Sequence, residues 1–247
     1  MPSLESMADL QQGFAFHIYL IFDTAASRNF GTRREDFCNV LRRWHDRMCA
    51  FAQKEFSGGP AIRIGVLEYA KSCTWITRSG PQDLREYIRW AYNISRYRNV
   101  GAALDELDGK LRPEGYLVPG SFLQMPIIVF ITGGFSTDDY NSALKRIHAN
   151  RWFSKATRIG FALGKYADVE MVGDIVGDSR LVFQTEDATV LERLLYLTTT
   201  LELCRAWESF RELEPLDDLG SEVARAFVVE TGIDLKAFCP LLPGRRV

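Results

Sequence analysis

The sequence predicts an α/β fold with a mainly parallel central sheet, one antiparallel edge strand and helices on both faces. Two apolar runs, residues 18–22 and 127–131, contain no charged side chain, as is typical of strands buried on both faces. Each run ends in small polar residues, Asp23-Thr24 and Thr132-Gly133, which mark a turn from strand to helix. Strand-like and helix-like segments alternate along the chain, and this alternation favours parallel strands joined by crossover helices.

A long helix and a hairpin follow the first strand. Residues 33–56 carry apolar side chains at three- and four-residue spacing, which predicts one buried helical face, and Ser-Gly-Gly-Pro at 57–60 ends this helix. Residues 61–70 and 73–77 are typical of two strands, and the turn between them is tight. A direct hairpin of this kind makes one edge strand antiparallel to the rest of the sheet.

The remaining elements are predicted from proline positions, helical spacing and short apolar runs. In chain order they are a short helix at 81–90, a helix at 100–111, a loop at 113–122, a helix at 138–150, strands at 157–163 and 181–184 with a helix at 168–176 between them, and a closing helix at 188–207. These helices supply the crossover connections that parallel strands need.

These elements divide the chain into a polar leader at residues 1–13, one domain at 14–207 and a C-terminal extension at 208–247. The length of 247 residues suits one large α/β domain with a modest extension. The extension begins with acidic residues but holds an apolar group at 223–229, which a disordered tail would usually lack. We therefore expect it to fold back on the domain or to dock a partner.

The composition argues against nucleic acid and membranes as partners. With 30 basic and 32 acidic residues, the chain has no overall field that would attract nucleic acid or an anionic membrane. No apolar run reaches the length of a membrane span, and the first residues lack the pattern of a signal peptide. The five cysteines are scattered and include no CxxC pair, as expected for reduced thiols rather than disulfides or a zinc site. We therefore expect a cytoplasmic protein.

Three segments should meet at the carboxyl edge of this sheet, and together they resemble the von Willebrand factor A (vWA) family. Residues 23–27, Asp-Thr-Ala-Ala-Ser, stand where that family has a strand ending in Asp-Thr-Ser-Gly-Ser. Residues 99–104 match the helix start after the family's Gly-Thr, and residues 131–139 match its Thr-Asp-Gly turn and the Thr-Asp that follows. The likeness covers roughly residues 15–205 and is greatest with the bacterial tellurium-resistance type. It implies the Rossmann-like vWA fold.

The resemblance also implies a metal-ion-dependent adhesion site (MIDAS), where an Asp-x-Ser-x-Ser loop, a threonine and an aspartate hold Mg²⁺ or Mn²⁺. Hard divalent cations prefer such oxygen ligands. Here Asp23 and Ser27 remain, but Ala25 replaces the first serine, Arg98 the threonine and Gly133 the aspartate. One carboxylate and one hydroxyl beside a guanidinium should bind a divalent cation poorly. We expect a degenerate site without metal or other cofactor.

Two arrangements of Arg98 are consistent with the sequence. Its guanidinium can take the place of the cation and pair with Asp23, because its planar fork suits a carboxylate. Alternatively, Arg98 points into solvent and Asp23 caps its turn through backbone amides. For Asp138 and Asp139, which begin a predicted helix, capping of that helix is favoured over a ligand role.

Other candidate chemistry has little support in the sequence. His17 and His45 have no expected nucleophile or ligand partner nearby in sequence, and His148 is better explained by a surface or packing position, so a Ser-His-Asp or Cys-His triad is not expected. Gly133-Gly134 lacks the residues of a phosphate loop and is better explained by a tight turn. One aromatic and basic cluster would suit stacking on single-stranded nucleic acid, protein binding or solvated helix ends. Its members are Arg89, Trp90, Tyr92, Arg96, Tyr97 and Arg98.

The leading hypothesis is a non-enzymatic, cytosolic protein-interaction module. The strand-tip loops would supply its partner-binding residues, namely Ser27, Tyr97, Arg98 and Phe135. The resemblance implies a bacterial stress-response or conflict-defence setting, in which the partner is a kinase, a phosphatase or a ring-forming ATPase. The alternative is a hydrolase or nucleotide-binding enzyme on the same sheet, which would need a titratable group besides Asp23.

Overall fold

The computed structural model describes most of the chain after residue 13. The predicted leader at residues 1–13 and the site residues Ala25 and Ser27 lie outside the described residues. The described residues are 14–24, 34–78, 80–88, 90, 95–112, 115–116, 122–123, 125–212, 218–233 and 238.

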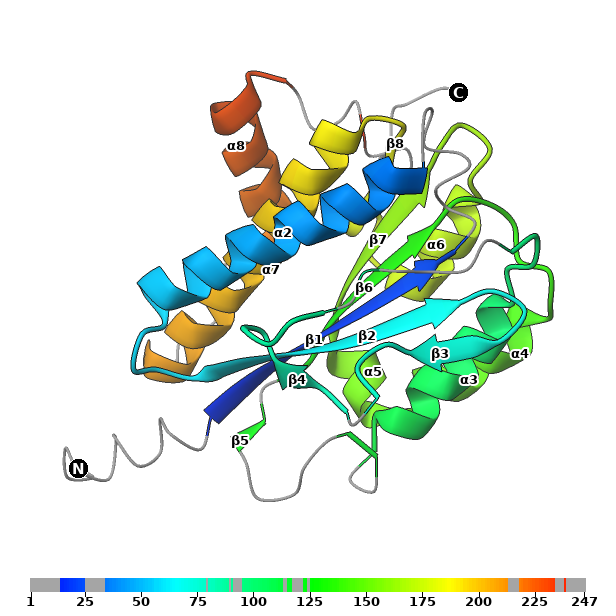
Figure 1. The fold of residues 1–247 in the computed structure, drawn as a ribbon, viewed down its shortest axis with the longest axis horizontal. Helices are drawn as coiled ribbons and strands as arrows, with labels where there is room; N and C mark the ends of the chain where they lie inside the picture. The colour runs from blue at the N-terminus through cyan, green and yellow to red at the C-terminus, as the bar shows by residue number, and fades with distance from the viewer. Residues whose placement is uncertain are drawn as a thin grey trace.

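The central sheet is mostly parallel, which confirms the predicted fold class (Figure 1). Its main path runs β3-β2-β1-β6-β7-β8, with β4 paired to β2 and β5 paired to β1. The predicted hairpin is β2–β3, and the short β4 is a second strand antiparallel to β2. The strands are β1 (Phe14–Asp23), β2 (Ala61–Tyr69), β3 (Cys73–Trp75), β4 (Gln82–Asp83), β5 (Phe122–Leu123), β6 (Ile127–Thr132), β7 (Thr157–Leu163) and β8 (Val182–Thr185).

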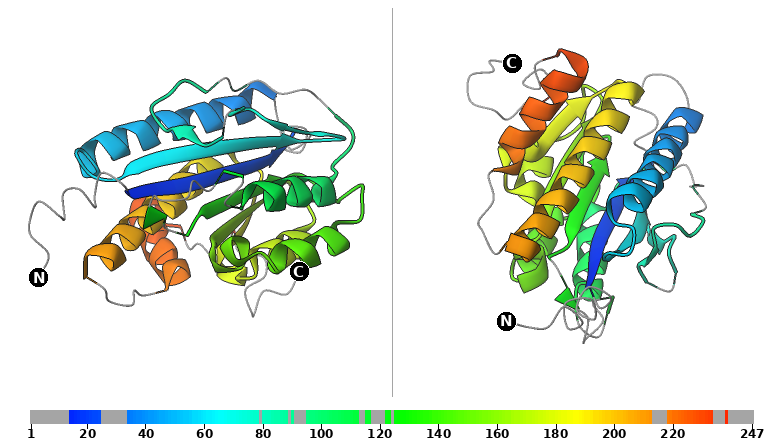
Figure 2. Two further views of the ribbon diagram at one scale, coloured as in Figure 1. Left: turned by 90° about the horizontal axis from the view of Figure 1, so that it is seen from below. Right: turned by 90° about the vertical axis from the view of Figure 1, so that its left-hand side faces the viewer.

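Helices cover both faces of the twisted sheet (Figure 2). Helices α2, α7 and α8 lie on one side, and α3, α4 and α6 lie on the other. None of the described helices is both long enough and apolar enough to cross a membrane. The helices are α2 (Arg34–Glu55), α3 (Val100–Lys110), α4 (Tyr140–His148), α5 (Arg151–Lys155), α6 (Val169–Val176), the 3-10 helix η2 (Ser179–Leu181), α7 (Ala188–Glu212) and α8 (Leu219–Thr231).

The β1 strand runs through the middle of the core. Each side chain of residues 18–22 is at most 1% exposed, and the Phe22 ring packs edge-on against Phe37 of α2. Helix α2 is joined to α7 by a hydrogen bond from Trp44 Nε1 to Thr199 Oγ1 (3.2 Å). A buried aromatic pair contributes about 0.5 to 1.5 kcal/mol beyond its buried area. The core therefore gives the loops at the carboxyl edge of the sheet a rigid base.

The predicted helix at 81–90 is wrong. Residues 82–83 form β4, and Leu84 N donates to Ile62 O (2.9 Å), so this segment extends the edge of β2. Pro81 is compatible with the start of a helix. The backbone groups of an edge strand nevertheless need partners, and pairing with β2 satisfies them here.

The predicted helix at 138–150 is shorter than expected and a second helix follows it. Helix α4 ends at His148, and the Asn150 side chain accepts hydrogen bonds from the Trp152 and Phe153 amides at the start of α5. Asparagine is a favoured N-terminal cap because its side-chain oxygen satisfies amides that the first turn leaves without partners. The predicted helix is therefore two helices, α4 and α5, separated at the Asn150 cap.

The C-terminal extension folds back onto the domain where the structure describes it. Helix α7 continues to Glu212, so the predicted boundary at residue 207 falls inside a helix. Helix α8 packs beside α7, with Leu219, Val223 and Phe227 buried (Figure 1). Part of the apolar group at residues 223–229 therefore packs against the domain.

Candidate functional site

The candidate site lies at the carboxyl edge of the sheet, where the strand order reverses between β1 and β6. Helix α2 follows β1 and α4 follows β6, and these helices cover opposite faces, so the two connections diverge (Figure 2). Such a point in an open α/β sheet leaves a crevice at the strand ends. Asp23 ends β1, Thr132 ends β6, and Tyr69 lies opposite Asp23 at the end of β2.

Asp23 and Arg98 form a buried ion pair. Arg98 Nε donates to Asp23 Oδ2 over 2.8 Å, and the side chains are 18% and 0% exposed respectively. The Gly133 amide also points to Asp23 Oδ2, at 3.3 Å. Of the two arrangements considered from the sequence, the structure has the ion pair. Because both groups have lost water, each needs the other, and removal of either would leave an uncompensated charge.

The loop after β6 holds the backbone of Arg98. The Arg98 amide donates to Thr137 Oγ1 (2.8 Å), and the Thr137 amide donates back to Arg98 O (2.8 Å). Ser136 Oγ also donates to Arg98 O (3.3 Å), and Thr137 Oγ1 donates to Asn99 Oδ1 (2.8 Å). Two segments distant in sequence are therefore locked together beside the ion pair.

Gly134 allows Arg98 to lie against the backbone of this loop. A Cβ atom at Gly134 would stand 3.0 Å from Arg98 Cζ and 3.1 Å from Nε, which is too close for an ordinary contact. Neither Gly133 nor Gly134 has a positive φ angle. Gly134 therefore needs no left-handed backbone, and its lack of a side chain permits the close approach of the guanidinium.

Asp138 and Asp139 cap two different helices. Asp139 accepts from the amides of Asn141 and Ser142 at the start of α4, as predicted, and its hydrogen bond with the Ser142 hydroxyl is the main cause that lowers its pKa. Asp138 instead accepts from Gly101 N and Ala102 N, both at 2.9 Å, and so caps α3. Both aspartates cap a helix, as predicted. Asp138, however, caps α3 and not α4, the helix that follows it in sequence.

Buried hydroxyl groups surround the ion pair. Thr24, Tyr69 and Thr132 are all fully buried, and none of their hydroxyls makes a hydrogen bond of normal geometry to a described residue. Burial and then the Asp23 charge raise the pKa of Tyr69 well above its usual value, although the nearby Thr132 hydroxyl opposes this shift. Tyr69 is therefore neutral at physiological pH. Buried hydroxyls without protein partners usually bind water or a ligand.

Exposed aromatic side chains stand around the same edge. Tyr97 is 50% exposed and Phe135 is 66% exposed, and both flank Arg98 through the loops just described. Lys71, in the turn after β2, has its ammonium 5.4 Å from the centre of the Tyr97 ring. Sequence reasoning missed Tyr166, which is 68% exposed in the loop after β7. Its position just beyond a strand tip is the signal that would have identified it.

The aromatic and basic cluster predicted at 89–98 does not form one surface. Trp90 is buried, and its ring lies 5.9 Å from the His45 ring in an edge-on contact. Tyr97 and Arg98 lie near the sheet edge, against Lys71 and Asp23 respectively, whereas Arg89 and Tyr92 fall outside the described residues. A tryptophan that stacks on bases must be accessible, so the described part of this cluster lacks its largest ring for nucleic-acid binding.

His45 and Cys49, four residues apart on α2, lie in contact, with Cys49 Sγ 3.8 Å from His45 Nε2. The expectation that His45 has no nucleophile nearby is therefore wrong, although the surroundings of the described histidines do not favour catalysis. His17 is buried, and burial with the nearby Arg63 charge lowers its pKa to about 4. His45 Nε2 lies 2.7 Å from Leu84 O, and Cys49 Sγ lies 3.3 Å from the same oxygen. Burial raises the pKa of Cys49, so its reactive thiolate form is disfavoured.

The residues around Asp23 do not fit the divalent cation that the vWA resemblance implies. The Arg98 guanidinium is a permanent cation 2.8 Å from the carboxylate oxygen, and its charge would oppose a metal ion there. Gly133 stands where the family has an aspartate, so the carboxylate ligand is missing, and the Gly133 amide donates to Asp23 Oδ2. Among the described residues, no group of three or more His, Cys, Asp or Glu side chains could hold a metal ion.

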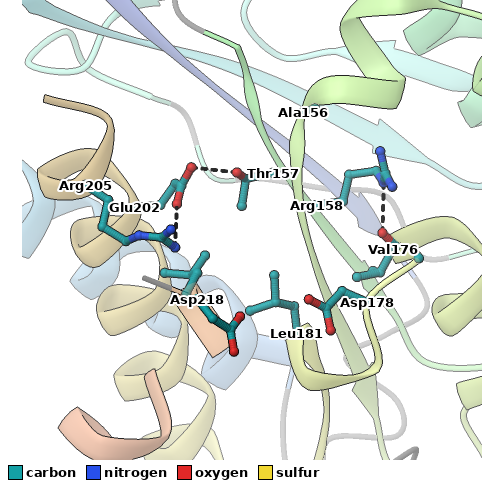
Figure 3. A pocket seen from close by; sticks show the side chains of 11 residues that line it. Ala156, Thr157, Arg158, Val176, Asp178, Leu181, Glu202, Arg205 and Asp218 are labelled. Atoms are coloured by element: carbon teal, nitrogen blue, oxygen red, sulfur yellow. Dashed lines mark hydrogen bonds and ion pairs between the residues drawn. The ribbon is translucent and has the colours of Figure 1, made fainter. Parts of the chain in front are cut away.

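A separate polar cavity of about 440 Å³ opens at the amino end of β7 (Figure 3). Thr157 Oγ1 donates to Glu202 Oε1 (2.6 Å), and Arg205 lies between Glu202 and Glu222 of α8 at 3.6 and 3.7 Å. Burial raises the pKa of Glu202. Arg158 donates to Val176 O (2.9 Å). The charged side chains around this cavity pair with other groups of the same chain. We therefore interpret the cavity as part of the polar contact between α8 and the rest of the domain.

Comparison with known proteins identifies the fold. No protein-family model and no curated protein matches the chain. Proximal thread matrix protein 1 (PTMP1) of the mussel byssus, with a zinc-occupied MIDAS motif, matches with a TM-score of 0.54 and 13% identity over 76% of this chain and 48% of that one. VWA2, the ArnB paralog of Sulfolobus acidocaldarius, matches with a TM-score of 0.51 and 12% identity, over 76% of this chain and 45% of that one. The chain has the vWA fold.

The vWA fold explains the order of the strands, and identities this low carry no further conclusion. The chain spans less than half the length of these two solved structures, at 48% and 45%. At the strand tips the described residues present an ion pair, buried hydroxyl groups and exposed aromatic rings.

Proposed function

We propose that this vWA-fold protein is a non-enzymatic protein-interaction module whose docking face is the carboxyl edge of the sheet. The observation that carries the proposal is the exposure of Tyr97 and Phe135 around the buried Asp23–Arg98 pair. Aromatic and arginine side chains are enriched at the energetic centres of protein interfaces. Here they stand on loops fixed to a rigid sheet, so little ordering is needed on binding.

The proposed docking face comprises Tyr97, Arg98 and Phe135. We include Tyr166 because it is exposed just beyond the tip of β7, and Ser27 because of its position in the sequence motif. Arg98 takes the place of a metal ion in this proposal, which makes the site degenerate and its binding independent of divalent cations. The argument is electrostatic, because a guanidinium beside Asp23 neutralises the carboxylate that a metal would need.

The biological setting of the proposal comes from the resemblance in sequence motifs. We propose a cytoplasmic adaptor in a bacterial stress-response or conflict-defence system of the tellurium-resistance type, with a kinase, phosphatase or ring-forming ATPase as partner. The alternative of a hydrolase or nucleotide-binding enzyme requires a second titratable group beside Asp23. Tyr69 is the nearby candidate, and its raised pKa makes it a poor general base at neutral pH.

Affinity enrichment from the native host, with the full chain as bait, tests this proposal. Tyr97→Ala and Phe135→Ala should lose a partner that the wild-type chain retains, without a change in melting temperature. Tyr87→Ala is the matched control, because Tyr87 is 87% exposed but lies in the segment after β4, away from the strand tips. If all three variants retain every partner of the wild type, the docking face lies elsewhere.

A further inference from the structure

We propose that the polar cavity at the amino end of β7 binds a small zwitterion with one carboxylate and one ammonium group, such as a free aliphatic amino acid. The cavity has a volume of about 440 Å³ and lies at the opposite edge of the sheet from Asp23. Cavities that bind small molecules measure about 300 to 1,000 Å³. The site is separate from the proposed docking face, so the two proposals can fail independently.

Arg205 has hydrogen-bonding capacity that the chain leaves unused. Its Nε is buried and makes no hydrogen bond to a described residue. Its Nη1 lies 3.6 Å from Glu202 Oε2, and its Nε lies 3.7 Å from Glu222 Oε2, and both distances exceed that of a hydrogen bond. The side chain is 17% exposed, so bulk water reaches little of it. A buried donor without a partner is costly, and an acceptor oxygen in the cavity would relieve that cost.

Glu202 offers a matching acceptor next to Arg205. Its Oε1 accepts from Thr157 Oγ1 (2.6 Å), whereas its Oε2 faces Arg205 at a distance too long for a hydrogen bond. Burial is the main cause that raises the pKa of Glu202, so the charge of this carboxylate is incompletely compensated. An ammonium group in the cavity would supply both a donor and the missing positive charge.

The spacing of these two groups suits an α-amino acid. Arg205 and Glu202 present opposite charges 3.6 Å apart at their nearest atoms, on one side of the cavity (Figure 3). An α-amino acid carries its carboxylate and its ammonium group on a single carbon atom. One such molecule can therefore place its carboxylate against Arg205 and its ammonium group against Glu202, and each charge then gains a direct hydrogen bond.

Arg158, on the other side of the cavity, favours the carboxylate end of the ligand (Figure 3). Its Nε donates to Val176 O (2.9 Å) and its Nη1 donates to Phe153 O (2.6 Å), so both of these contacts are with uncharged backbone oxygens. Burial lowers the pKa of Arg158, as expected for a cation without a counter-charge. A negative group in the cavity would provide that counter-charge.

The charge balance excludes a ligand with one kind of charge alone. Three arginines and four carboxylates stand around the cavity, so the net charge is close to zero and an anion gains little from it. A lone cation is equally disfavoured, because Asp178 and Asp218 already accept hydrogen bonds from Arg180. The charged residues are Arg158, Arg180, Arg205, Asp178, Glu202, Asp218 and Glu222.

The rest of the cavity wall is apolar and would contact an aliphatic side chain. The apolar lining residues come from three different elements and from the residue before β7, and they are Ala156, Val176, Leu181 and Leu219. Burying a leucine-sized side chain against such groups contributes about 1.5 to 3 kcal/mol. Leu219 begins α8, so a bound ligand would also join the C-terminal extension to the body of the domain.

Calorimetric titration of the full chain with three matched ligands tests this site, at constant ionic strength with chloride as the balancing ion. Leucine carries both charged groups, isocaproate is leucine without the ammonium group, and isoamylamine is leucine without the carboxylate. We expect saturable binding of leucine in the millimolar range or tighter. The other two should bind at least about tenfold more weakly, because each lacks one charge-assisted hydrogen bond.

Two variants and a control assign the binding to this cavity. Glu202→Gln keeps an acceptor for Thr157 but removes the charge, and it should weaken leucine binding about tenfold without weakening isocaproate binding. The double variant Glu202→Gln/Arg205→Gln removes both charges together and should abolish leucine binding, and a melting curve verifies that it folds. Glu208→Gln is the control, because Glu208 is exposed on the same helix and does not line the cavity.

Absence of saturable leucine binding would overturn the site. Equal affinities for leucine and isocaproate would overturn its assignment to a zwitterion. Unchanged leucine binding by the folded double variant would place the ligand elsewhere and would also overturn the proposal. Hydrogen–deuterium exchange gives a second readout, because leucine should slow amide exchange in residues 156–158 and 219–223, and no change in either segment would contradict binding at this cavity.

Discussion

Arg98 and Thr137 are joined by two hydrogen bonds of 2.8 Å, one in each direction. The Arg98 amide donates to the Thr137 hydroxyl, and the Thr137 amide donates to the Arg98 carbonyl oxygen. The loop after β6 therefore sets the position of the residue that neutralises Asp23, which ends β1. The two central strands of the sheet are linked at their tips by one ion pair and this doubly bonded loop.

Arg98→Ala should destabilise the protein. It leaves the fully buried Asp23 carboxylate without its charge partner, and a broken buried ion pair costs about 3 kcal/mol or more. Urea unfolding gives the free-energy difference. The double variant Asp23→Asn/Arg98→Gln should recover most of this loss. If Arg98→Ala is as stable as the wild type, the ion pair contributes nothing and the account of this edge is wrong.

Gly134→Ala should lower stability by about 1 kcal/mol, the smaller end of what overpacking costs. Its Cβ would stand 3.0 Å from Arg98 Cζ, and the arginine cannot move away without leaving Asp23. Gly109→Ala is the matched control, because a Cβ there meets nothing within 4 Å inside α3. The control should stabilise the protein by about 0.5 to 1 kcal/mol through helix propensity. Equal effects of the two substitutions would rule out the close approach.

Stability should fall between pH 6.5 and 4 because of His17. Its pKa is about 4 in the folded protein and 6.5 in an exposed chain, so the unfolded state binds the extra proton as the pH falls through this range. The loss reaches about 3 kcal/mol near pH 4 and is absent above pH 7. Urea unfolding of His17→Phe should show a flatter pH dependence than the wild type. The exposed His148→Phe is the control, and an unchanged slope for His17→Phe would contradict this prediction.

Phe227→Ala should destabilise the domain by about 3 kcal/mol or more, as expected for a large buried ring replaced by a methyl group. Phe227 is fully buried on α8, whereas Val229 on the same helix is 87% exposed. Val229→Ala should therefore change the free energy of unfolding by no more than about 0.5 kcal/mol. Thermal melts of both variants decide whether α8 is part of the folded domain or a passive extension.

The fold was predictable because its strongest signals are local. Continuous apolar runs at residues 18–22 and 127–131 identify strands buried on both faces, and helical spacing identifies α2 and α7. The helix predicted at 81–90 failed because β4 exists through pairing with β2, a contact that no local pattern reports. The closing helix extends past its predicted end at residue 207 for a similar reason, since α7 and α8 are stabilised by burial against each other.

The site was predictable in its position but not in its details. The polar residues after β1 and β6 indicated one edge of the sheet, because parallel strands bring their carboxyl ends together. The choice between an ion pair and a solvated Arg98 depended on burial and on the fit of Gly134, which are tertiary properties. Asp138 illustrates the same limit, since it caps α3 across space while its neighbour caps the adjacent α4.

Hydrogen–deuterium exchange of the full chain, alone and with its captured partner in the presence of EDTA, tests the docking face most directly. We expect the partner to slow amide exchange in residues 97–99 and 133–137, at the tips of the sheet, and to leave the segment after β4 and the outer surface of α8 unchanged. Protection confined to α8 or to the outer helices, with the strand tips unaffected, would contradict the account. Loss of all protection in EDTA, with recovery in Mg²⁺, would contradict the replacement of a metal ion by Arg98.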